Sequence, residues 1–356
     1  MQREDVARET DRPDRTLTIG PRRRQPGASA WTLNAVWAEG PVESEFVVLR
    51  WDDLVRTRWD RSLWVQARGL VTWWRMYWAA GVIADAARSS RTILIALLAP
   101  PAAVFLFGLA ILLVTVAVTI LLAEACRALG LPPWAGLAGL GLAATAPTLW
   151  RQLDARLNLC WLSRGFLHMA ELSRDRIPGM EARIDAFADR LLAEADDPRW
   201  DEIVVVGHSS GSLHAVPMVG RALTRRPDLG MTGPRLSLLT VGHCLPGYAM
   251  LGPLAAYAAD LARLVETRRI PWFDITAPSD PGSAAGWHPL RHSPHAEDES
   301  RVVRRSPRFH RAMTPAAFRR LRRDPMAFHF QYMRSCDHPE VYDWFRLIAG
   351  PEPVAP

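Results

Sequence analysis

A serine lies between two glycines where the chain could expose a nucleophile. Residues 207–211 read Gly-His-Ser-Ser-Gly, between the β-branched run 203–206 and the periodic apolar stretch 213–224. The run predicts a buried strand and the stretch a helix, so the five residues form a sharp turn between them. Such a turn presents a hydroxyl at its apex, and the next backbone N–H can stabilise an oxyanion. The pattern predicts Ser209 as nucleophile and Ser210 as one oxyanion donor.

The other residues of this turn are expected to serve its geometry. Gly207 and Gly211 stand where the strand and helix backbones would crowd a side chain. His208 is expected to be a packing residue. The alternative is a Gly/Ser-rich turn of an α/β sheet without any catalytic role.

An activated serine needs a base and a group that orients the base. Asp280 follows the expected strand 272–276, and active-site groups of open α/β sheets lie at the carboxyl ends of strands. Asp274 lies inside that strand and is expected to be a buried or partnered carboxylate. The alternative is that Asp280 has only a structural role as a turn-forming residue, because Pro281 and Gly282 follow it.

Histidines downstream of Asp280 are candidates for the base. His329 is preferred because it lies in apolar surroundings with Tyr332 three residues on. His338 is the alternative base and His310 a weaker candidate. His243 precedes the acid and is expected at most to line a pocket.

Together these residues resemble the α/β-hydrolase superfamily over residues 181–345. The likeness is greatest to a membrane-anchored bacterial branch, in which Leu-Arg-Trp-Asp-Asp, here residues 49–53, precedes a hydrophobic hairpin. The resemblance implies a doubly wound, mostly parallel sheet, the order serine, acid, histidine, and a lipase- or esterase-like activity without a cofactor. The pair His329 and Tyr332 is similar to the His-x-x-Tyr pattern of lipase-like hydrolases. The sequence departs from the superfamily in one respect. The second oxyanion donor there comes from a loop after an early strand, and no segment before Glu45 matches that loop, so either the donor differs or the chain is truncated.

Five segments are expected along the chain. They are a disordered N-terminus (1–15), N-terminal strands of the hydrolase sheet (16–58), a Trp/Arg-rich interfacial helix (59–92), an inserted transmembrane hairpin (93–150) and the catalytic core (151–350). Residues 31–37 and 45–50 read as paired strands around a Gly-Pro turn, and 21–27 as a loop.

The hairpin rests on two uncharged stretches. Residues 93–123 carry no charge, and 102–123 alone suffice for a hydrocarbon core of about 30 Å. The stretch 129–149 is rich in glycine, which allows close helix contact. The alternative is a pair of buried helices in a soluble core. Arginines flank the hairpin on both sides, which predicts the inner membrane with the catalytic part in the cytoplasm.

Composition limits the remaining interpretations. All 43 basic residues are arginine and the net charge is +6, which GC-rich bacterial coding explains without any function. Nine arginines in Arg301–Arg323 suit anionic lipid headgroups or a solvated face, and no nucleic acid is expected. His288, His292 and His295 are expected in a solvated loop, and no metal site is expected. Cys126, Cys160, Cys244 and Cys336 are expected to be reduced thiols.

These observations predict a membrane-anchored serine hydrolase of lipid-like esters or thioesters. One alternative is an inactive membrane scaffold or binding protein with the same fold. Another is an acyltransferase that uses the same triad.

Overall fold

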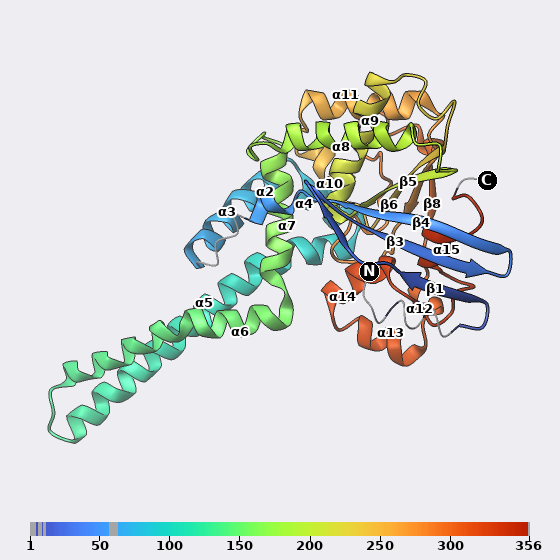
Figure 1. Cartoon of the computed structure of the whole chain (residues 1–356). Helices are drawn as coiled ribbons and strands as arrows, with labels where there is room; N and C mark the ends of the chain where they lie inside the picture. Colours follow the sequence, from blue (N-terminus) through green and yellow to red (C-terminus); the bar gives the residue numbers. More distant parts are fainter. Residues whose placement is uncertain (1–4, 6–8, 10–11, 57–62, 355–356) are drawn as a thin grey trace.

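The computed structural model describes residues 5, 9, 12–56 and 63–354 of the chain. In this part of the chain the strands form two four-stranded sheets, with helices around them and one long helix that projects from the body (Figure 1). The fold is mixed α/β.

The second sheet along the chain is entirely parallel. Its strands stand in the order β5 (Glu202–His208), β6 (Arg235–Val241), β7 (Trp272–Ile275), β8 (Val302–Arg305). Val205 packs into one apolar core, whereas Val204 and Val206 contact the other, as the two-residue period of a strand requires. The expected parallel strand before the serine is therefore confirmed, but its full burial is not: β5 is at the edge of the sheet and most of its residues are half-buried, because a cavity lies beside it.

The first sheet is antiparallel and consists of N-terminal strands. They are β1 (Arg15–Ile19), β2 (Arg23–Gln25), β3 (Ala28–Trp37) and β4 (Gly40–Leu49). The expected hairpin is the β3–β4 pair, which joins Trp37 to Gly40 at its turn end. Two expectations differ: the stretch 21–27 contains β2, and the N-terminal strands pair among themselves rather than within the parallel sheet.

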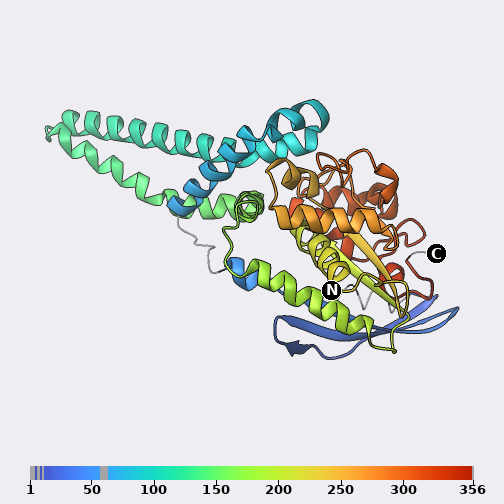
Figure 2. The same ribbon diagram turned by 90° about the horizontal axis from the view of Figure 1, so that it is seen from above.

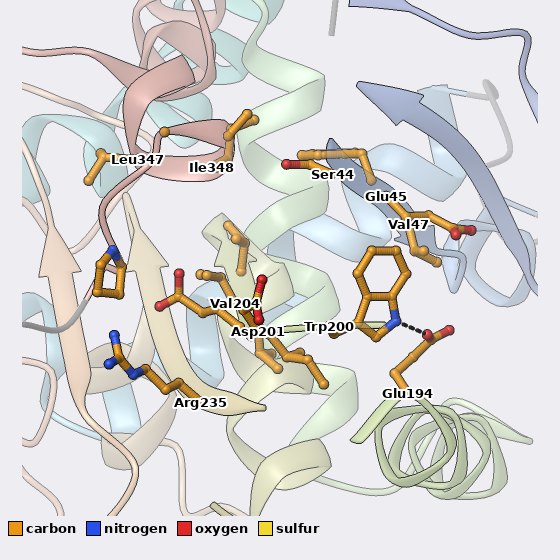
Figure 3. A pocket seen from close by; sticks show the side chains of 18 of the residues that line it. Ser44, Glu45, Val47, Glu194, Trp200, Asp201, Val204, Arg235, Leu347 and Ile348 are labelled. Atoms are coloured by element: carbon orange, nitrogen blue, oxygen red, sulfur yellow. Dashed lines mark hydrogen bonds between the residues drawn. The ribbon is translucent and has the colours of Figure 1, made fainter. Parts of the chain in front are cut away.

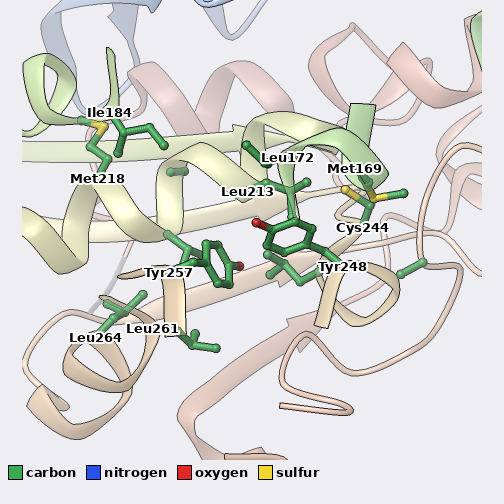
Figure 4. Packing of buried hydrophobic residues seen from close by; sticks show 14 of the residues in the cluster. Met169, Leu172, Ile184, Leu213, Met218, Cys244, Tyr248, Tyr257, Leu261 and Leu264 are labelled. Atoms are coloured by element: carbon green, nitrogen blue, oxygen red, sulfur yellow. The ribbon is translucent and has the colours of Figure 1, made fainter. Parts of the chain in front are cut away.

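Helices cover both faces of the parallel sheet. One face carries α8 (Met180–Ala195), α9 (Ser212–Arg225), α10 (Leu245–Met250) and α11 (Ala255–Thr267). The other carries α12 (Phe309–Ala312), α13 (Pro315–Leu321), α14 (Pro325–Phe330) and α15 (Trp344–Ala349). The core under α9 and α11 is closed by aromatic contacts such as Tyr248 against Tyr257, whose ring centroids are 4.9 Å apart (Figure 4).

A helical segment lies between β4 and α8 in the sequence. It comprises α2 (Asp52–Arg56), α3 (Leu63–Ala79), α4 (Val82–Ser89), α5 (Arg91–Ala128), the 3-10 helix η1 (Pro133–Thr145), α6 (Ala146–Leu157) and α7 (Leu159–Leu172). Helix α5 and the returning η1 run side by side away from the sheets in both views (Figure 2). Among the described helices, α5 is the one that is long and apolar enough to cross a membrane, and most of its apolar stretch is exposed.

Glycines bring η1 against α5. A Cβ at Gly136 would lie 2.5 Å from the backbone nitrogen of Ala123, and one at Gly139 would lie 2.6 Å from Thr119 Oγ1. The two glycines share a face because a 3-10 helix has three residues per turn. The expected close contact through glycine is therefore present, whereas the second expected span is not a single α-helix, and its membrane crossing stays a prediction.

Two further expectations about segments need correction. Of the supposedly disordered residues 1–15, most of 1–11 lie outside the described residues, but Asp5 and Glu9 are buried and paired. Within the aromatic helix α3, Trp73 and Tyr77 are buried against α7, so this face packs inward, while Trp78 is 67% exposed.

Candidate functional site

The turn after β5 has the strained geometry that a nucleophile elbow needs. Ser209 has φ 54°, in the left-handed region that non-glycine residues rarely adopt. Its carbonyl accepts hydrogen bonds from Ser212 Oγ (2.6 Å) and Cys244 Sγ (3.5 Å). These bonds hold the strained residue between the strand and helix α9.

Crowding explains one of the two flanking glycines. A Cβ at Gly207 would lie 2.8 Å from Ser212 Cα and 2.9 Å from Ala215 Cβ, so a side chain is excluded there. A Cβ at Gly211 would meet nothing within 4 Å. The expectation of crowding is confirmed at Gly207 and wrong at Gly211, because Gly211 lines an open cavity.

Asp280 is fully buried and accepts hydrogen bonds from three residues. Oδ2 accepts from His329 Nδ1 (2.8 Å) and the Tyr332 hydroxyl (2.9 Å), and Oδ1 accepts from the Gly282 N–H (2.9 Å). Burial alone would raise the pKa of this carboxyl, but His329 and the other donors outweigh it and lower the pKa. Asp280 is therefore an ionised carboxylate, as a partner for an imidazole should be.

Tyr332 explains the spacing that drew attention to His329. Its hydroxyl donates to Asp280 and accepts from the backbone N–H of Ala277 (2.9 Å). Burial raises the pKa of Tyr332 well above its usual value, so the hydroxyl keeps its proton and remains a donor. The tyrosine three residues after the histidine thus fixes the carboxylate that the histidine contacts.

The hydrogen bonding of His329 determines its tautomer. The side chain is 1% exposed, and Nδ1 must carry the proton because the Asp280 carboxylate only accepts. In the neutral ring Nε2 then bears a lone pair, and this buried atom has no hydrogen-bond partner among the described residues. Nε2 is therefore the nitrogen of this ring that could accept a proton.

His208 joins the elbow to this histidine. Its Nε2 donates to the backbone carbonyl of His329 (2.9 Å), and the two ring centroids are 4.6 Å apart. Burial, with a contribution from His329, lowers the pKa of His208 to about 3, so its ring is neutral. The expected packing role is confirmed, and the added hydrogen bond had no signal in the sequence. Since Ser209 is the next residue, the serine segment lies beside the Asp280–His329 pair, but Ser209 and His329 are not hydrogen-bonded, because His329 Nε2 has no partner among the described residues.

Two residues around this pair were missed by sequence reasoning. The Trp161 ring on α7 lies 5.3 Å from that of His329, centroid to centroid. A Cβ at Gly282 would lie 2.6 Å from His329 Nδ1 and 2.9 Å from Trp161 Cη2. The Asp-Pro-Gly sequence was a signal for Gly282, although it was interpreted only as a turn; no pattern pointed to Trp161.

The rival site residues lie elsewhere or have other partners. The His338 side chain is 45% exposed and lies 3.4 Å from Glu340, and His310 is also exposed. Asp274 is buried and accepts from Thr240 Oγ1 (2.8 Å), which confirms the expectation of a partnered carboxylate. His243 is buried as well, 3.6 Å from the same Asp274.

The histidine-rich loop divides its side chains among separate partners. His292 Nε2 lies 2.9 Å from Asp85, and His288, which is buried rather than solvated, lies 3.2 Å from the Glu299 carbonyl. Among the described residues no three His, Cys, Asp or Glu side chains gather as a metal site.

A cavity of about 1450 Å³ lies between strands β4 and β5 (Figure 3). His208 and Gly211 of the serine turn belong to its lining. Trp51, directly after β4, also lines it, with its ring 4.6 Å from that of His214 on α9. An early-strand loop therefore does reach the elbow helix. The sequence prediction considered only loops before Glu45, whereas Trp51 follows β4.

The fold and the site define a mixed α/β protein whose strained serine turn lies beside a buried aspartate–histidine pair. No family model, no curated protein and no solved structure matches the chain.

Proposed function

We propose that the protein is a membrane-anchored serine hydrolase of the α/β-hydrolase type, which cleaves carboxylic esters or thioesters with a lipid-like acyl chain. The observation that carries the proposal is the His329 ring, which is held by Asp280 through Nδ1 and has its buried Nε2 unpartnered beside the elbow.

The reaction follows from these positions. Ser209 Oγ attacks the carbonyl carbon while His329 Nε2 takes its proton, and Asp280 stabilises the imidazolium that forms. The oxyanion is bound by the backbone N–H of Ser210 and, as second donor, by that of Trp51, which lines the same cavity as His208 and Gly211. The imidazolium then protonates the leaving alcohol or thiol, and water hydrolyses the acyl-serine by the same steps.

The lipid-like substrate is supported by helix α5. Its apolar side chains face outward; Phe105 and Leu121, for example, are each 68% exposed. An exposed apolar surface of this extent on a projecting helix is typical of membrane contact. On this proposal α5 and the returning segment anchor the protein in the bacterial inner membrane with the site on the cytoplasmic side.

The base of α5 adjoins the acid loop. Thr92 Oγ1 donates to the Pro278 carbonyl (3.1 Å), two residues before Asp280. A substrate that leaves the bilayer beside α5 would therefore arrive close to the aspartate–histidine pair.

Labelling with a fluorophosphonate probe tests the assignment on the full chain in detergent. We expect wild type and Ser210→Ala to be labelled, because alanine keeps the backbone N–H, and Ser209→Ala to remain unlabelled. Equal labelling of Ser209→Ala and wild type would refute the nucleophile. For the base, we expect loss of esterase activity in His329→Ala and retention in His338→Ala, and the reverse result would exchange the two roles.

A further inference from the structure

The arginine-rich segment Arg301–Arg323 divides into parts with different roles. Arg301 is buried, 6% exposed, and donates to the carbonyls of Leu264 (2.9 Å), Val265 (3.1 Å) and Ile270 (2.6 Å). It fixes the end of α11 and does not belong to any surface patch, which corrects the expectation for this residue.

The next four arginines line an open depression at the surface, where each of them is exposed. Arg304, Arg305, Arg308 and Arg311 line a cavity of about 450 Å³ together with Ser306, Glu340 and Val341. Helix α13 and the residues after it carry the remaining arginines of the segment, outside this cavity.

The pocket concentrates positive charge without matching carboxylates. Arg304 points to the other face of β8, where it donates to the Gly286 carbonyl (2.8 Å). Among the described residues the guanidinium groups of Arg305, Arg308 and Arg311 have no ion-pair partner. The one acidic residue of the lining, Glu340, lies 3.4 Å from His338 instead. Arginines elsewhere have such partners, as Arg183 has in Asp53 (2.8 Å). Neighbouring like charges repel, so an anion bound among them would relieve the repulsion.

The pocket lies at the edge of the sheet that carries the candidate site. Strand β8 is parallel to its neighbours and ends at Arg305, whose carbonyl accepts from the Thr276 N–H (3.2 Å). Strand β5, which leads to Ser209, is three positions away in the same sheet. Neighbouring strands are about 4.8 Å apart, so the two strand ends are separated by about 14 Å.

We propose that Arg305, Arg308 and Arg311 form a phosphate-binding site, with Ser306 as an additional hydroxyl donor. Guanidinium groups pair with phosphate oxygens through two parallel N–H donors, and several of them suit a dianion better than a single carboxylate. The phosphate is that of a phospholipid headgroup or of a soluble phosphate compound. This site goes beyond the proposed hydrolase activity and does not depend on Ser209.

Calorimetric titration of the full chain in dodecyl maltoside micelles tests the site. One arm uses inorganic phosphate, and the other uses micelles that contain dihexanoyl phosphatidic acid, with dihexanoyl phosphatidylcholine as its comparison. The pocket variant is R305Q/R308Q, and the matched control is R319Q/R320Q, which removes the same charge from exposed positions on α13.

We expect saturable binding to wild type and to the control R319Q/R320Q. The pocket variant R305Q/R308Q should bind about tenfold more weakly for each arginine that it lacks. Binding in the first arm identifies a soluble phosphate compound as sufficient, and binding in the second arm alone identifies a lipid headgroup. Equal loss in the two double variants, or no saturable binding in either arm, would overturn the proposal. Fluorophosphonate labelling of R305Q/R308Q reports on Ser209 separately, so failure of the phosphate site is distinguishable from failure of the hydrolase assignment.

Discussion

Replacing Gly282 by alanine tests whether the position of the His329 ring sets the rate of the proposed ester hydrolysis. The new Cβ would lie 2.6 Å from His329 Nδ1, 2.7 Å from its Cγ and 2.9 Å from Trp161 Cη2. Favourable contacts between such atoms begin at about 3.5 Å, so the ring must move by about 0.8 Å. The backbone of Gly282 is not in the left-handed region, so alanine adds no backbone strain and the effect falls on the ring.

The size of the effect follows from this displacement. The His329–Asp280 hydrogen bond is 2.8 Å long and would be stretched or bent as the ring moves. A misplacement of about 1 Å can cost about 100-fold in rate, so we expect kcat to fall about 30- to 100-fold with little change in KM. Overpacking should also lower the free energy of unfolding by about 1–3 kcal/mol.

Hydrolysis of p-nitrophenyl esters by the detergent-solubilised protein measures the loss. Gly247→Ala is the matched control, because a Cβ on this glycine of α10 would meet nothing within 4 Å. Urea unfolding of both variants shows whether the fold is kept. The reasoning fails if Gly282→Ala retains activity within twofold of wild type, or if Gly247→Ala loses as much.

Three further changes have defined outcomes. Tyr332→Phe removes one donor to Asp280 and leaves a buried backbone N–H unpaired, so urea denaturation should show the free energy of unfolding lowered by about 1–3 kcal/mol, with a lower kcat. Gly139→Leu should lower the thermal unfolding temperature in detergent because its Cβ would lie 2.6 Å from a side chain of α5, whereas Gly141→Leu, with nothing within 4 Å, should not. Burial lowers the pKa of His168 to about 4, below the unfolded value of about 6.5, so the unfolded state binds the proton first as the pH falls. The contribution of neutral His168 to the free energy of unfolding is therefore complete above pH 6.5 and falls by about 1.4 kcal/mol per pH unit from there towards pH 4. A pH series of urea denaturations should show a smaller fall in the free energy of unfolding for His168→Phe.

The parts of the site that sequence predicts well are those encoded locally. Four β-branched residues indicate a buried strand, and the glycines beside Ser209 mark the turn that follows. Asp280 could be placed because it comes just after a strand, and strand ends meet at one edge of a parallel sheet. His329 could be chosen over His338 because apolar neighbours indicate a buried ring. Each of these inferences needs only a few consecutive residues.

The parts that sequence did not predict depend on contacts between distant segments. Gly211 is the second glycine of the turn around Ser209, a position at which the motif predicts crowding. Its open surroundings are known only from the position of α9 in the fold. Arg301 looks like its exposed neighbours, although three carbonyls at the end of α11 bind it. The ring of Trp161 reaches His329 across 168 positions of sequence, since α7 follows the projecting segment back to the body.

The same reasoning explains why the projecting segment and the site must be considered together. Helix α5 is held at its first turn by the bond from Thr92 to the Pro278 carbonyl (3.1 Å), and Ser89 just before it accepts from Trp287 Nε1 (3.0 Å). Both partners belong to the loop that carries Asp280. A shift of α5 relative to the body would therefore strain the loop that orients His329, while α7 at the other end of the segment places Trp161 against that ring. The helical segment thus contacts the Asp280 loop at one end and the His329 ring at the other, so its position bears on the geometry of the aspartate–histidine pair.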